Sequence, residues 1–447
     1  MKSLLAFIAC VVCKITHGIL RLLNKGGTAL PGKLALKICP EVLEKTSRGV
    51  STLMVTGTNG KTTSVRMAET ALQNAGLDAF SNRSGANLIG GIACEFIVNT
   101  NLFVRPKKKW AVIECDEAAA RQVFRATKPK AVLVTNLFKD QLDRYGTLTT
   151  PRDAIAQGLS ATPETLVCLN ADCPMAASIA DKVPNEILWY GMSTGDKLSP
   201  ESGEESRCVN CGAKLHYGYV TYANLGGFYC PKCGARRHDT LVTVSDVLPD
   251  GSFVISDGSE KTLAECALPG LYNIYNAAGV TALMTAAGAE LRCTLKAVSS
   301  FECGFGRMEE FALGKLGARM ILIKNAAAAD QTLETIRSDK SAKSLVFAIN
   351  DRPADGTDIS WLDDADFGVI RRMRNLKNVY CTGDRSDAMA QRLEREGVEC
   401  ETFSSYAKLL KRLRNEDAFI YILPTYTAML EMRQELVHRL GGKNFWE

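Results

Sequence analysis

The sequence predicts an α/β protein with two domains built on parallel sheets. Short apolar runs alternate with helix-like segments from about residue 46 to 200 and again from about 312 onward, which is typical of buried parallel strands covered by helices on both faces. A glycine-rich turn at 57–63 joins such a run to a helix and indicates a phosphate-binding loop. Two Cys-x-x-Cys pairs between 208 and 233 interrupt the first domain and indicate an inserted zinc ribbon.

Length and composition agree with this organisation. A chain of 447 residues is long enough for two or three domains. We expect a helical lead-in at 1–45, a central ATP-binding domain at 46–308 with the ribbon at 205–236, and a C-terminal Rossmann-like α/β domain at 309–447. Charged residues make up 23% of the chain and hydrophobic residues 46%, as in ordinary soluble proteins. Most of the 16 cysteines stand singly in apolar surroundings, which is typical of reduced thiols in the cytoplasm.

The N-terminal segment has an apolar run at 4–12 between Lys2 and Lys14. The run is shorter than the ~20 residues that span a bilayer and no clear signal-peptide cleavage site follows, so we expect a cytoplasmic protein with no transmembrane segment. Large apolar residues at helical spacing predict an amphipathic helix, and a second short helix is expected after Pro31-Gly32. We expect the first helix to pack on the body of the protein, with binding to a membrane surface as the alternative. Its apolar positions are Leu4, Ile8, Val11, Val12, Ile15, Ile19 and Leu22.

The phosphate-binding loop follows an apolar strand that ends near Val55. Backbone N–H groups and a helix N-terminus bind phosphate, and Gly57 and Gly60 allow the tight turn. Lys61 supplies a positive charge for the phosphates and Thr62 an oxygen for Mg²⁺. The loop is shorter than the common form; an ordinary glycine turn, the alternative, does not account for the agreement of strand, Gly-Lys-Thr-Thr and helix. The loop residues are Gly57, Thr58, Asn59, Gly60, Lys61, Thr62 and Thr63.

Acidic residues follow three further apolar runs. The carboxyl ends of parallel strands meet at one edge of a sheet, so we expect these side chains near the phosphate loop. Carboxylate oxygens are the ligands that Mg²⁺ prefers. Any single one would more often be a helix cap or a solvated carboxylate, but three in phase with the loop favour a metal–nucleotide site. The segments are Glu114-Cys115-Asp116-Glu117, Asp140 with Asp143, and Asp172.

The two Cys-x-x-Cys pairs, Cys208 with Cys211 and Cys230 with Cys233, are separated by 18 residues. This spacing is a strong signature of a structural Zn²⁺ site, because four thiolates complete a tetrahedron and leave no open position. A pair of disulfides is the alternative, but it conflicts with the cytoplasmic character of the other cysteines. Nucleic-acid binding by the ribbon is not favoured, since its charges are mixed and form no basic stripe.

Two further groups of polar residues follow the ribbon. Asn273 and Asn276 lie three apart, on one face of a predicted Ala-rich helix, although one of them could be the N-cap. Arg307 is expected at a domain junction, where it could reach a phosphate or form a surface salt bridge. In the second domain, an acidic segment at 351–366 surrounds Trp361 and indicates a packed or docking surface. A nucleotide domain facing a second α/β domain suits ATP-dependent activation of a carboxylate followed by attack of an amine.

Several motifs resemble those of Mur ligases and folylpolyglutamate synthases. They are the loop at 57–63, Glu114, Thr135-Asn136 with Asp140-Gln141-Leu142-Asp143, the segment 270–276 and Gly306-Arg307-Met308-Glu309, with Gln141 and Tyr272 where the family has His. The resemblance implies that Lys61 and Glu114 serve catalysis. The residues implied to bind ATP and Mg²⁺ are the whole loop, Glu114, Asn136, Gln141, Asn273, Asn276, Arg307, Lys324 and Asn325; family members tend to have Pro where this chain has Ala326, which leaves the role of Asn325 open.

The ribbon and the segments 82–87, 354–361 and 423–427 resemble the MurT family of lipid II isoglutaminyl synthase subunits. This resemblance implies a heterodimer with a glutaminase, GatD, working at the inner face of the membrane in peptidoglycan synthesis. The reaction implied is amidation of the D-glutamate α-carboxyl of the lipid II stem peptide to D-isoglutamine through an acyl phosphate. Either Asp355 or Asp358 is implied to complete the Cys-His pair of the glutaminase.

Two other functions remain to be weighed. A ligase that adds an amino acid to a UDP-linked or folate substrate would share the loop, but the zinc ribbon and the lack of a D-N-P-R-type amino-acid signature argue against it. A non-catalytic ATP-binding scaffold would also share the fold. The intact Lys61, Thr62 and Glu114 argue against that function.

Overall fold

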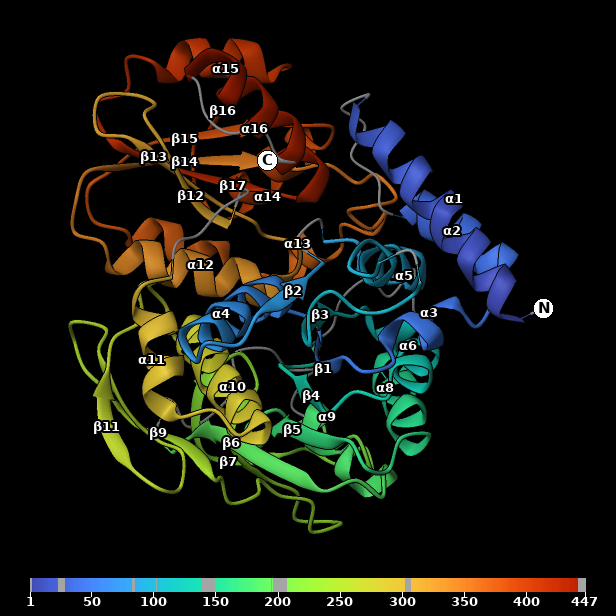
Figure 1. The fold of residues 1–447 in the computed structure, drawn as a ribbon. Helices are drawn as coiled ribbons and strands as arrows, with labels where there is room; N and C mark the ends of the chain where they lie inside the picture. The colour runs from blue at the N-terminus through green and yellow to red at the C-terminus, as the bar shows by residue number, and fades with distance from the viewer. Residues whose placement is uncertain are drawn as a thin grey trace. The chain divides into compact units, whose positions relative to one another are not determined.

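The computed structural model shows two compact units, each with its own sheet (Figure 1). Unit 1 comprises residues 1–138, 148–267 and 271–301, and unit 2 comprises 139–147, 268–270 and 302–447. The lead-in at 1–45 belongs to unit 1. The structure describes residues 2–22, 29–82, 85–101, 103–138, 149–193, 195, 207–301 and 307–440, except for the side chains of Lys2, Ser3 and Arg307.

Unit 1 is built on a nine-stranded sheet in the order β11-β10-β9-β6-β5-β4-β1-β3-β2. The pairs from β2 to β9 along this order are parallel, and β10 and β11 continue antiparallel from β9. The predicted parallel sheet is therefore confirmed, and β1 lies between β3 and β4. The strands are β1 Ser51–Thr56, β2 Ala79–Ser81, β3 Trp110–Glu114, β4 Ala131–Val134, β5 Leu166–Asn170, β6 Ile187–Met192, β9 Val242–Val247, β10 Phe253–Ser256 and β11 Lys261–Ala264.

Helices cover this sheet as right-handed crossovers require, so that α4, α10 and α11 share one face and α5, α6 and α8 the other. Helix α10 is buried over most of its length because its residues are apolar or small on nearly every side. The helices and 3₁₀ turns after β1 are α4 Lys61–Asn74, α5 Ile89–Val98, η1 Glu117–Ala119, α6 Ala120–Thr127, α8 Thr150–Ser160, α9 Pro174–Ala177, η2 Ala180–Lys182, α10 Leu271–Ala287 and α11 Leu291–Ser299.

The N-terminal helices α1 (Lys2–Leu22), α2 (Ala29–Ile38) and α3 (Val42–Ser47) pack on unit 1. Helix α2 begins before Pro31-Gly32 rather than after it, because proline is tolerated in the first turn of a helix. Gly32 is needed where α2 crosses α5: a Cβ there would lie 1.7 Å from the carbonyl oxygen of Gly90. This close approach brings α2 against α5 and gives α1 a surface on which to pack.

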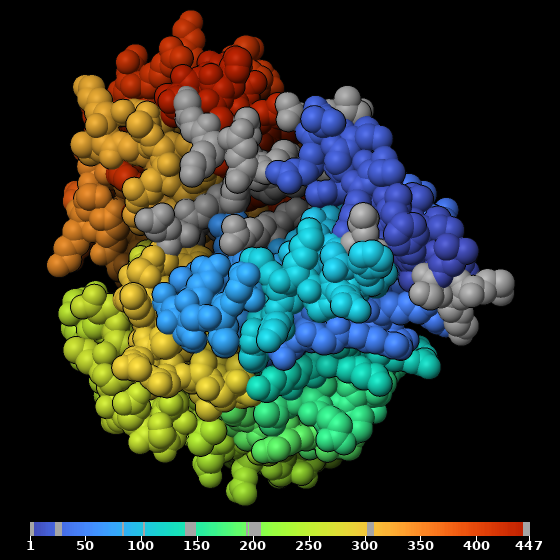
Figure 2. All heavy atoms as spheres, in the orientation of Figure 1, coloured from blue at the N-terminus to red at the C-terminus, as the bar shows by residue number. Residues whose placement is uncertain are grey.

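Helix α1 packs on unit 1, as predicted, but through its small residues rather than through the large apolar residues whose spacing predicted an amphipathic helix. Ala9, Cys10 and Cys13 are fully buried against α2 and α5, whereas Ile15 is 57% and Leu22 87% exposed. Figure 2 shows α1, in dark blue, at the molecular surface. The helix also continues through Lys14, so the prediction that the apolar segment is too short to span a bilayer is wrong. By length and composition alone, residues 4–22, with a mean hydropathy of 1.8, could cross a membrane.

The ribbon forms a separate two-stranded sheet of β7 (His216–Tyr222) and β8 (Leu225–Tyr229), paired antiparallel. Its small core joins the ribbon to unit 1, since Tyr217 and Phe228 lie in one buried cluster with Ala177 of α9. The ribbon is thus docked on the sheet rather than extended from it.

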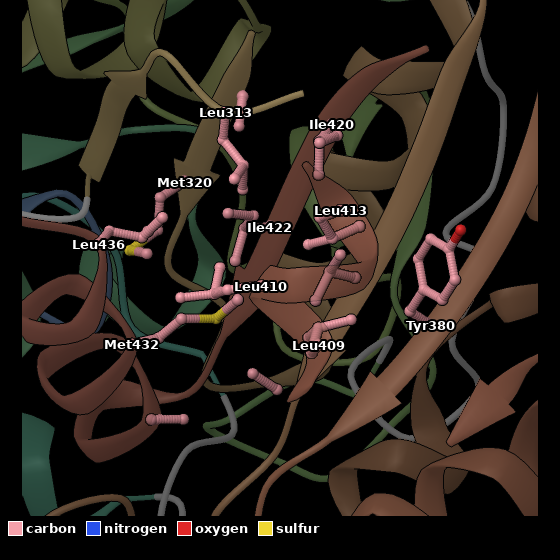
Figure 3. Packing of buried hydrophobic residues seen from close by; sticks show 14 of the residues in the cluster. Leu313, Met320, Tyr380, Leu409, Leu410, Leu413, Ile420, Ile422, Met432 and Leu436 are labelled. Carbon is pink, nitrogen blue, oxygen red and sulfur yellow. The ribbon is translucent and has the colours of Figure 1, made fainter. Parts of the chain in front are cut away.

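Unit 2 has a six-stranded sheet in the order β12-β13-β17-β14-β15-β16, parallel except for β12. Its strands are β12 Arg307–Phe311, β13 Ala318–Ile321, β14 Lys343–Ala348, β15 Leu376–Thr382, β16 Glu401–Thr402 and β17 Phe419–Pro424. The helices and 3₁₀ turn are α12 Ala326–Ser338, α13 Trp361–Asp364, η3 Phe367–Arg372, α14 Ser386–Arg395, α15 Tyr406–Leu413 and α16 Tyr426–Leu440. Figure 3 shows part of its core, where Leu409, Leu410, Leu413, Met432 and Leu436 gather around Met320, Ile420 and Ile422. The predicted second α/β domain is confirmed.

Candidate nucleotide-binding site

The phosphate loop connects β1 to the N-terminus of α4, as predicted. Gly57 and Gly60 have φ angles of +121° and +85°, in the region that favours glycine. Space is also restricted: a Cβ on Gly57 would lie 2.4 Å from Thr135 Oγ1, and one on Gly60 would lie 2.1 Å from Asn276 Oδ1. Both glycines are therefore required for the chain to pass between β4 and α10.

The segment after β4 holds the loop in place. The Asn59 N–H donates to Asn136 Oδ1 at 3.0 Å, and Asn136 Nδ2 donates back to the Asn59 carbonyl at 3.2 Å. Thr135 Oγ1 donates to the same carbonyl at 2.7 Å, and the Thr58 N–H donates to the carbonyl of Asn136 at 2.8 Å. Asn136, predicted to bind the nucleotide, shapes the loop in this structure. Its neighbour Thr135 was not among the predicted site residues.

Lys61 is the cation of the loop. Its Nζ donates to the carbonyl oxygen of Gly57, to that of Thr58 at 3.4 Å and to Glu117 Oε1 at 3.0 Å. Burial opposes the charge of this ammonium, but Glu117, Glu114 and a third carboxylate nearby outweigh it and raise the pKa of Lys61. The lysine is therefore held fully charged at the N-terminus of α4.

Glu114 lies beside the loop at the carboxyl end of β3 and is 4% exposed. Its Oε2 accepts a hydrogen bond of 2.5 Å from Thr62 Oγ1, and its Oε1 accepts one of 3.0 Å from Asn87 Nδ2. Asn82 fixes the backbone of Glu114 through two hydrogen bonds of 2.8 Å. A carboxylate and a hydroxyl oxygen thus lie together at the helix N-terminus, and this is the donor set that Mg²⁺ takes next to phosphates.

Asn273 and Asn276 both lie in α10, which begins at Leu271, so neither is the N-cap that the sequence left as an alternative. Both are buried, and Asn276 Nδ2 donates to Asn273 Oδ1 at 3.2 Å. Because Asn276 Oδ1 approaches Gly60 so closely, the helix brings this pair to the phosphate loop.

Asp172 does not join the phosphate loop, contrary to the expectation for acidic residues at strand ends. It is fully buried and accepts hydrogen bonds from Arg237 Nε at 2.6 Å, from the Tyr275 hydroxyl at 2.7 Å and from the Met192 N–H at 2.6 Å. Burial raises the pKa of Asp172 despite the nearby guanidinium of Arg237. Asp172 thus ties Arg237, which directly follows the ribbon, to the end of β5 and to α10.

The remaining predicted nucleotide residues are not brought to the loop by described contacts. Gln141 and the side chain of Arg307, as well as Asp140 and Asp143, lie outside the described residues. Lys324 and Asn325 belong to unit 2, where Asn325 Oδ1 accepts from the Ala328 N–H at 2.9 Å and caps α12. Their binding of ATP stays a prediction.

The two aspartates implied for the glutaminase differ in their surroundings. Asp355 is 9% exposed and accepts hydrogen bonds from the Thr427 N–H at 2.6 Å and from Thr427 Oγ1 at 2.5 Å, at the N-terminus of α16. Asp358 is exposed, and its Oδ1 accepts from the Ser360 N–H at 2.8 Å. Asp355 is held within unit 2, whereas Asp358 is accessible from solvent.

The four cysteines of the ribbon form a cluster whose Sγ atoms all lie within 4.8 Å of one another, and none is in a disulfide. Cys208 and Cys233 are 3.5 Å apart at Sγ, as are Cys211 and Cys230. Thiolates bound to Zn²⁺ at about 2.3 Å lie roughly 3.8 Å apart in a tetrahedron, so the cluster fits this ion. Each Cys-x-x-Cys turn is closed by a glycine of positive φ, Gly212 or Gly234.

Besides Thr135, the sequence did not predict Asn82 and Asn87, the partners of Glu114, as site residues; it placed Glu117 near the loop, but not as the partner of Lys61. The sequence carried a signal for each, because Glu117 follows the strand end by three residues and both asparagines lie in the segment 82–87. Which of several carboxylates pairs with Lys61 depends on the turn η1, which a periodicity argument does not reveal.

Comparison with known proteins agrees with this geometry. Residues 322–429 match the family described as MurT ligase C-terminal, and 55–216 match the Mur ligase middle domain. The chain is 34% identical over 434 residues to the lipid II isoglutaminyl synthase (glutamine-hydrolyzing) subunit MurT of Streptococcus pneumoniae, covering 95% of each chain. It is 30% identical to the subunit of the same name from Staphylococcus aureus, covering 96% of this chain and 98% of that one.

Among solved structures, a pseudomurein peptide ligase type C from Methanothermus fervidus superposes with a TM-score of 0.69 at 19% identity, over 91% of this chain and 83% of that one. This likeness concerns the fold, and it confirms the predicted Mur-ligase-type architecture. The chain belongs to the MurT family of Mur-type ligases.

Proposed function

We propose that this chain is the synthase subunit of a lipid II isoglutaminyl synthase. It would use ATP to amidate the α-carboxyl group of D-glutamate in the lipid II stem peptide, with ammonia from a GatD-like glutaminase subunit. The observation that carries the proposal is the arrangement of Lys61 and Thr62 of the loop with Glu114 beside them, in a chain similar to a MurT subunit over 95% of its length.

The reaction proceeds in two steps. A carboxylate oxygen of the D-glutamate attacks the γ-phosphorus of ATP, the bond from that phosphorus to the β-phosphate oxygen breaks, and ADP leaves with the acyl phosphate formed. Ammonia then attacks the acyl carbon with its lone pair. The carbon–oxygen bond to phosphate breaks, inorganic phosphate leaves with the electron pair, and the nitrogen loses a proton to become the amide.

The residues of unit 1 have distinct roles in the first step. Lys61 exchanges its contacts with backbone carbonyls for phosphate oxygens and stabilises the charge that develops there. Thr62 and Glu114 would hold Mg²⁺, which when bound neutralises phosphate charge and orients the γ-phosphate. The N–H groups of the loop and the N-terminus of α4 bind the remaining phosphate oxygens.

The partner would supply ammonia by hydrolysing glutamine. We propose that Asp358, rather than Asp355, completes the Cys-His pair of that partner, because Asp358 is exposed while Asp355 is engaged with Thr427. An aspartate in this role accepts a hydrogen bond from the histidine and holds it in the productive tautomer.

The test uses the full-length chain with lipid II and ATP, and mass spectrometry detects replacement of the carboxyl hydroxyl by an amino group, which gives the amide. We expect amidation with ammonium alone, and with glutamine only after co-purification with a glutaminase subunit. Lys61→Ala should abolish both reactions, and Lys182→Ala, which changes an exposed lysine of the same unit, should abolish neither. Lack of amidated product with either nitrogen source would refute the proposal; addition of an amino acid instead would indicate a peptide-adding ligase.

A further inference from the structure

Helix α1 exposes a continuous apolar stripe. Residues spaced three, four or seven apart lie on one side of a helix, and the large apolar residues of α1 follow this spacing. Leu4 is 62% exposed, Ile15 57% and Ile19 52%, although each belongs to a residue type that is usually buried. The stripe consists of Leu4, Phe7, Ile8, Ile15, Ile19 and Leu22.

The opposite side of α1 packs against other helices of unit 1. Ala6, Ala9, Cys10 and Cys13 are at most 2% exposed and pack with residues of α2 and α5. Small residues thus form the intramolecular contact, while the residues with the largest apolar surface face outward. This is the reverse of an ordinary surface helix, whose large apolar side chains face the core.

The charge of this region is one-sided. Residues 1–40 contain Lys2, Lys14, Arg21, Lys25, Lys33 and Lys37 but no Asp or Glu. Lys33 and Lys37 of α2, which packs beside α1, are exposed, as is Arg21 at the end of α1. An apolar helix face in a segment whose charged residues are all cations complements a bilayer whose headgroups are anionic.

We propose that α1 docks unit 1 onto an anionic membrane surface, lying in the headgroup region with its apolar stripe towards the acyl chains. The inner face of α1 is buried on α2 and α5 from Ala6 to Cys13, so the helix binds the surface while it remains part of the folded unit. Two copies pairing through the stripe would bring together regions that contain cations and no acidic residue, and the resulting repulsion disfavours that arrangement.

The test is sedimentation of the full chain with vesicles that contain no lipid II, so that its outcome does not depend on the amidation activity. The wild type should bind vesicles of phosphatidylglycerol and phosphatidylcholine and should bind phosphatidylcholine alone far less. Ile8→Gln, Ile15→Gln and Ile19→Gln combined should lower binding about tenfold or more. A matched control, Leu248→Gln, Leu263→Gln and Leu316→Gln, changes exposed leucines elsewhere and should bind as the wild type does.

A second set of variants tests the charge. Arg21→Gln, Lys33→Gln and Lys37→Gln should each weaken binding to anionic vesicles about fivefold, with little change in thermal unfolding because all three are exposed. Failure of the wild type to bind anionic vesicles, or equal binding by the triple isoleucine variant, would overturn the proposal. Retention in the vesicles after an alkaline carbonate wash would indicate a spanning helix, and dimerisation that the isoleucine substitutions abolish would indicate a second copy; either result overturns surface docking.

Discussion

The ammonium of Lys61 lies 3.0 Å from the carboxylate of Glu117, and both side chains are nearly inaccessible to solvent. The cation that a nucleotide would require is therefore paired with a carboxylate of the protein itself. In the proposed function, nucleotide phosphates would have to compete with Glu117 for Lys61, and Glu117 would keep the lysine charged and in place until they bind.

Glu117→Gln should destabilise the nucleotide-free protein while increasing the stabilisation that ATP provides. Removing the carboxylate leaves the buried ammonium short of an anionic partner, at a cost of about 1–3 kcal/mol in the free energy of unfolding. Binding of ATP should then add more to the free energy of unfolding of the variant than to that of the wild type. Thermal unfolding with and without Mg-ATP measures both effects, and Glu186→Gln, at an exposed position of the same unit, serves as the control. Unchanged stability of the nucleotide-free variant would contradict the pairing.

Gly60→Ala should abolish nucleotide binding, whereas Gly76→Ala should not. Both glycines have positive φ, +85° and +74°, so alanine costs about 1–2 kcal/mol of backbone strain at either position. Only at Gly60 would the added Cβ also meet another residue, Asn276, while Gly76 has open space. Calorimetric titration with an ATP analogue separates the two variants; equal affinities would show that the approach of α10 to the loop is unimportant.

Asp358→Asn should eliminate glutamine-dependent amidation and leave ammonium-dependent amidation intact, because in the proposed function the exposed carboxylate serves only the partner subunit. Asp355→Asn should instead lower the thermal stability of the chain, since the Thr427 N–H and hydroxyl both donate to that carboxylate. The two reactions are followed side by side with each nitrogen source. If Asp355→Asn is stable and loses only the glutamine reaction, the assignment to Asp358 is wrong.

The cysteine cluster should hold one zinc ion per chain. Cys208→Ser should remove the ion and lower the melting temperature, because Cys208 also belongs to the buried cluster of the ribbon. Cys266→Ser, at a half-buried cysteine outside the cluster, should retain the metal. Elemental analysis of the purified variants provides the measurement. Wild-type protein that is fully folded and free of metal after purification without chelators would contradict a structural site.

Glu416 should stabilise unit 2 in a pH-dependent way. Burial opposes its charge, but hydrogen bonds from Tyr380, Ser344 and Asn378 outweigh burial and lower its pKa. Because the folded pKa is below the unfolded value, this stability is present above about pH 4.5 and is lost as the pH falls through the folded pKa.

Urea denaturation of Glu416→Gln tests this statement. At pH 7 the variant should be about 1–3 kcal/mol less stable than the wild type, and the difference should shrink below about pH 4.5. Glu399→Gln, at an exposed carboxylate, should show neither effect. A constant difference across this pH range would mean that the charge of Glu416 is not what stabilises the unit.

The fold class and the chemistry of the loop could be predicted from the sequence alone. The apolar run that leads to Glu114 is strand β3 in the structure, because a strand buried on both faces is apolar throughout. The loop at 57–63 and the cysteine cluster were likewise predictable, since spacing along the chain fixes their local geometry.

Tertiary structure decided which residues meet. Asp116, Glu117 and Asp172 all follow strand ends, yet only Glu117 pairs with Lys61, while Asp172 pairs with Arg237, which follows the ribbon. Tertiary structure also decided which face of α1 is buried. The spacing of its large residues predicted an amphipathic helix with one apolar face. The close crossing of α2 over α5 at Gly32 lets the face of small residues pack and leaves the face of large residues exposed. A sequence pattern specifies the faces of a helix, whereas the shape of the surface it meets determines which face is buried.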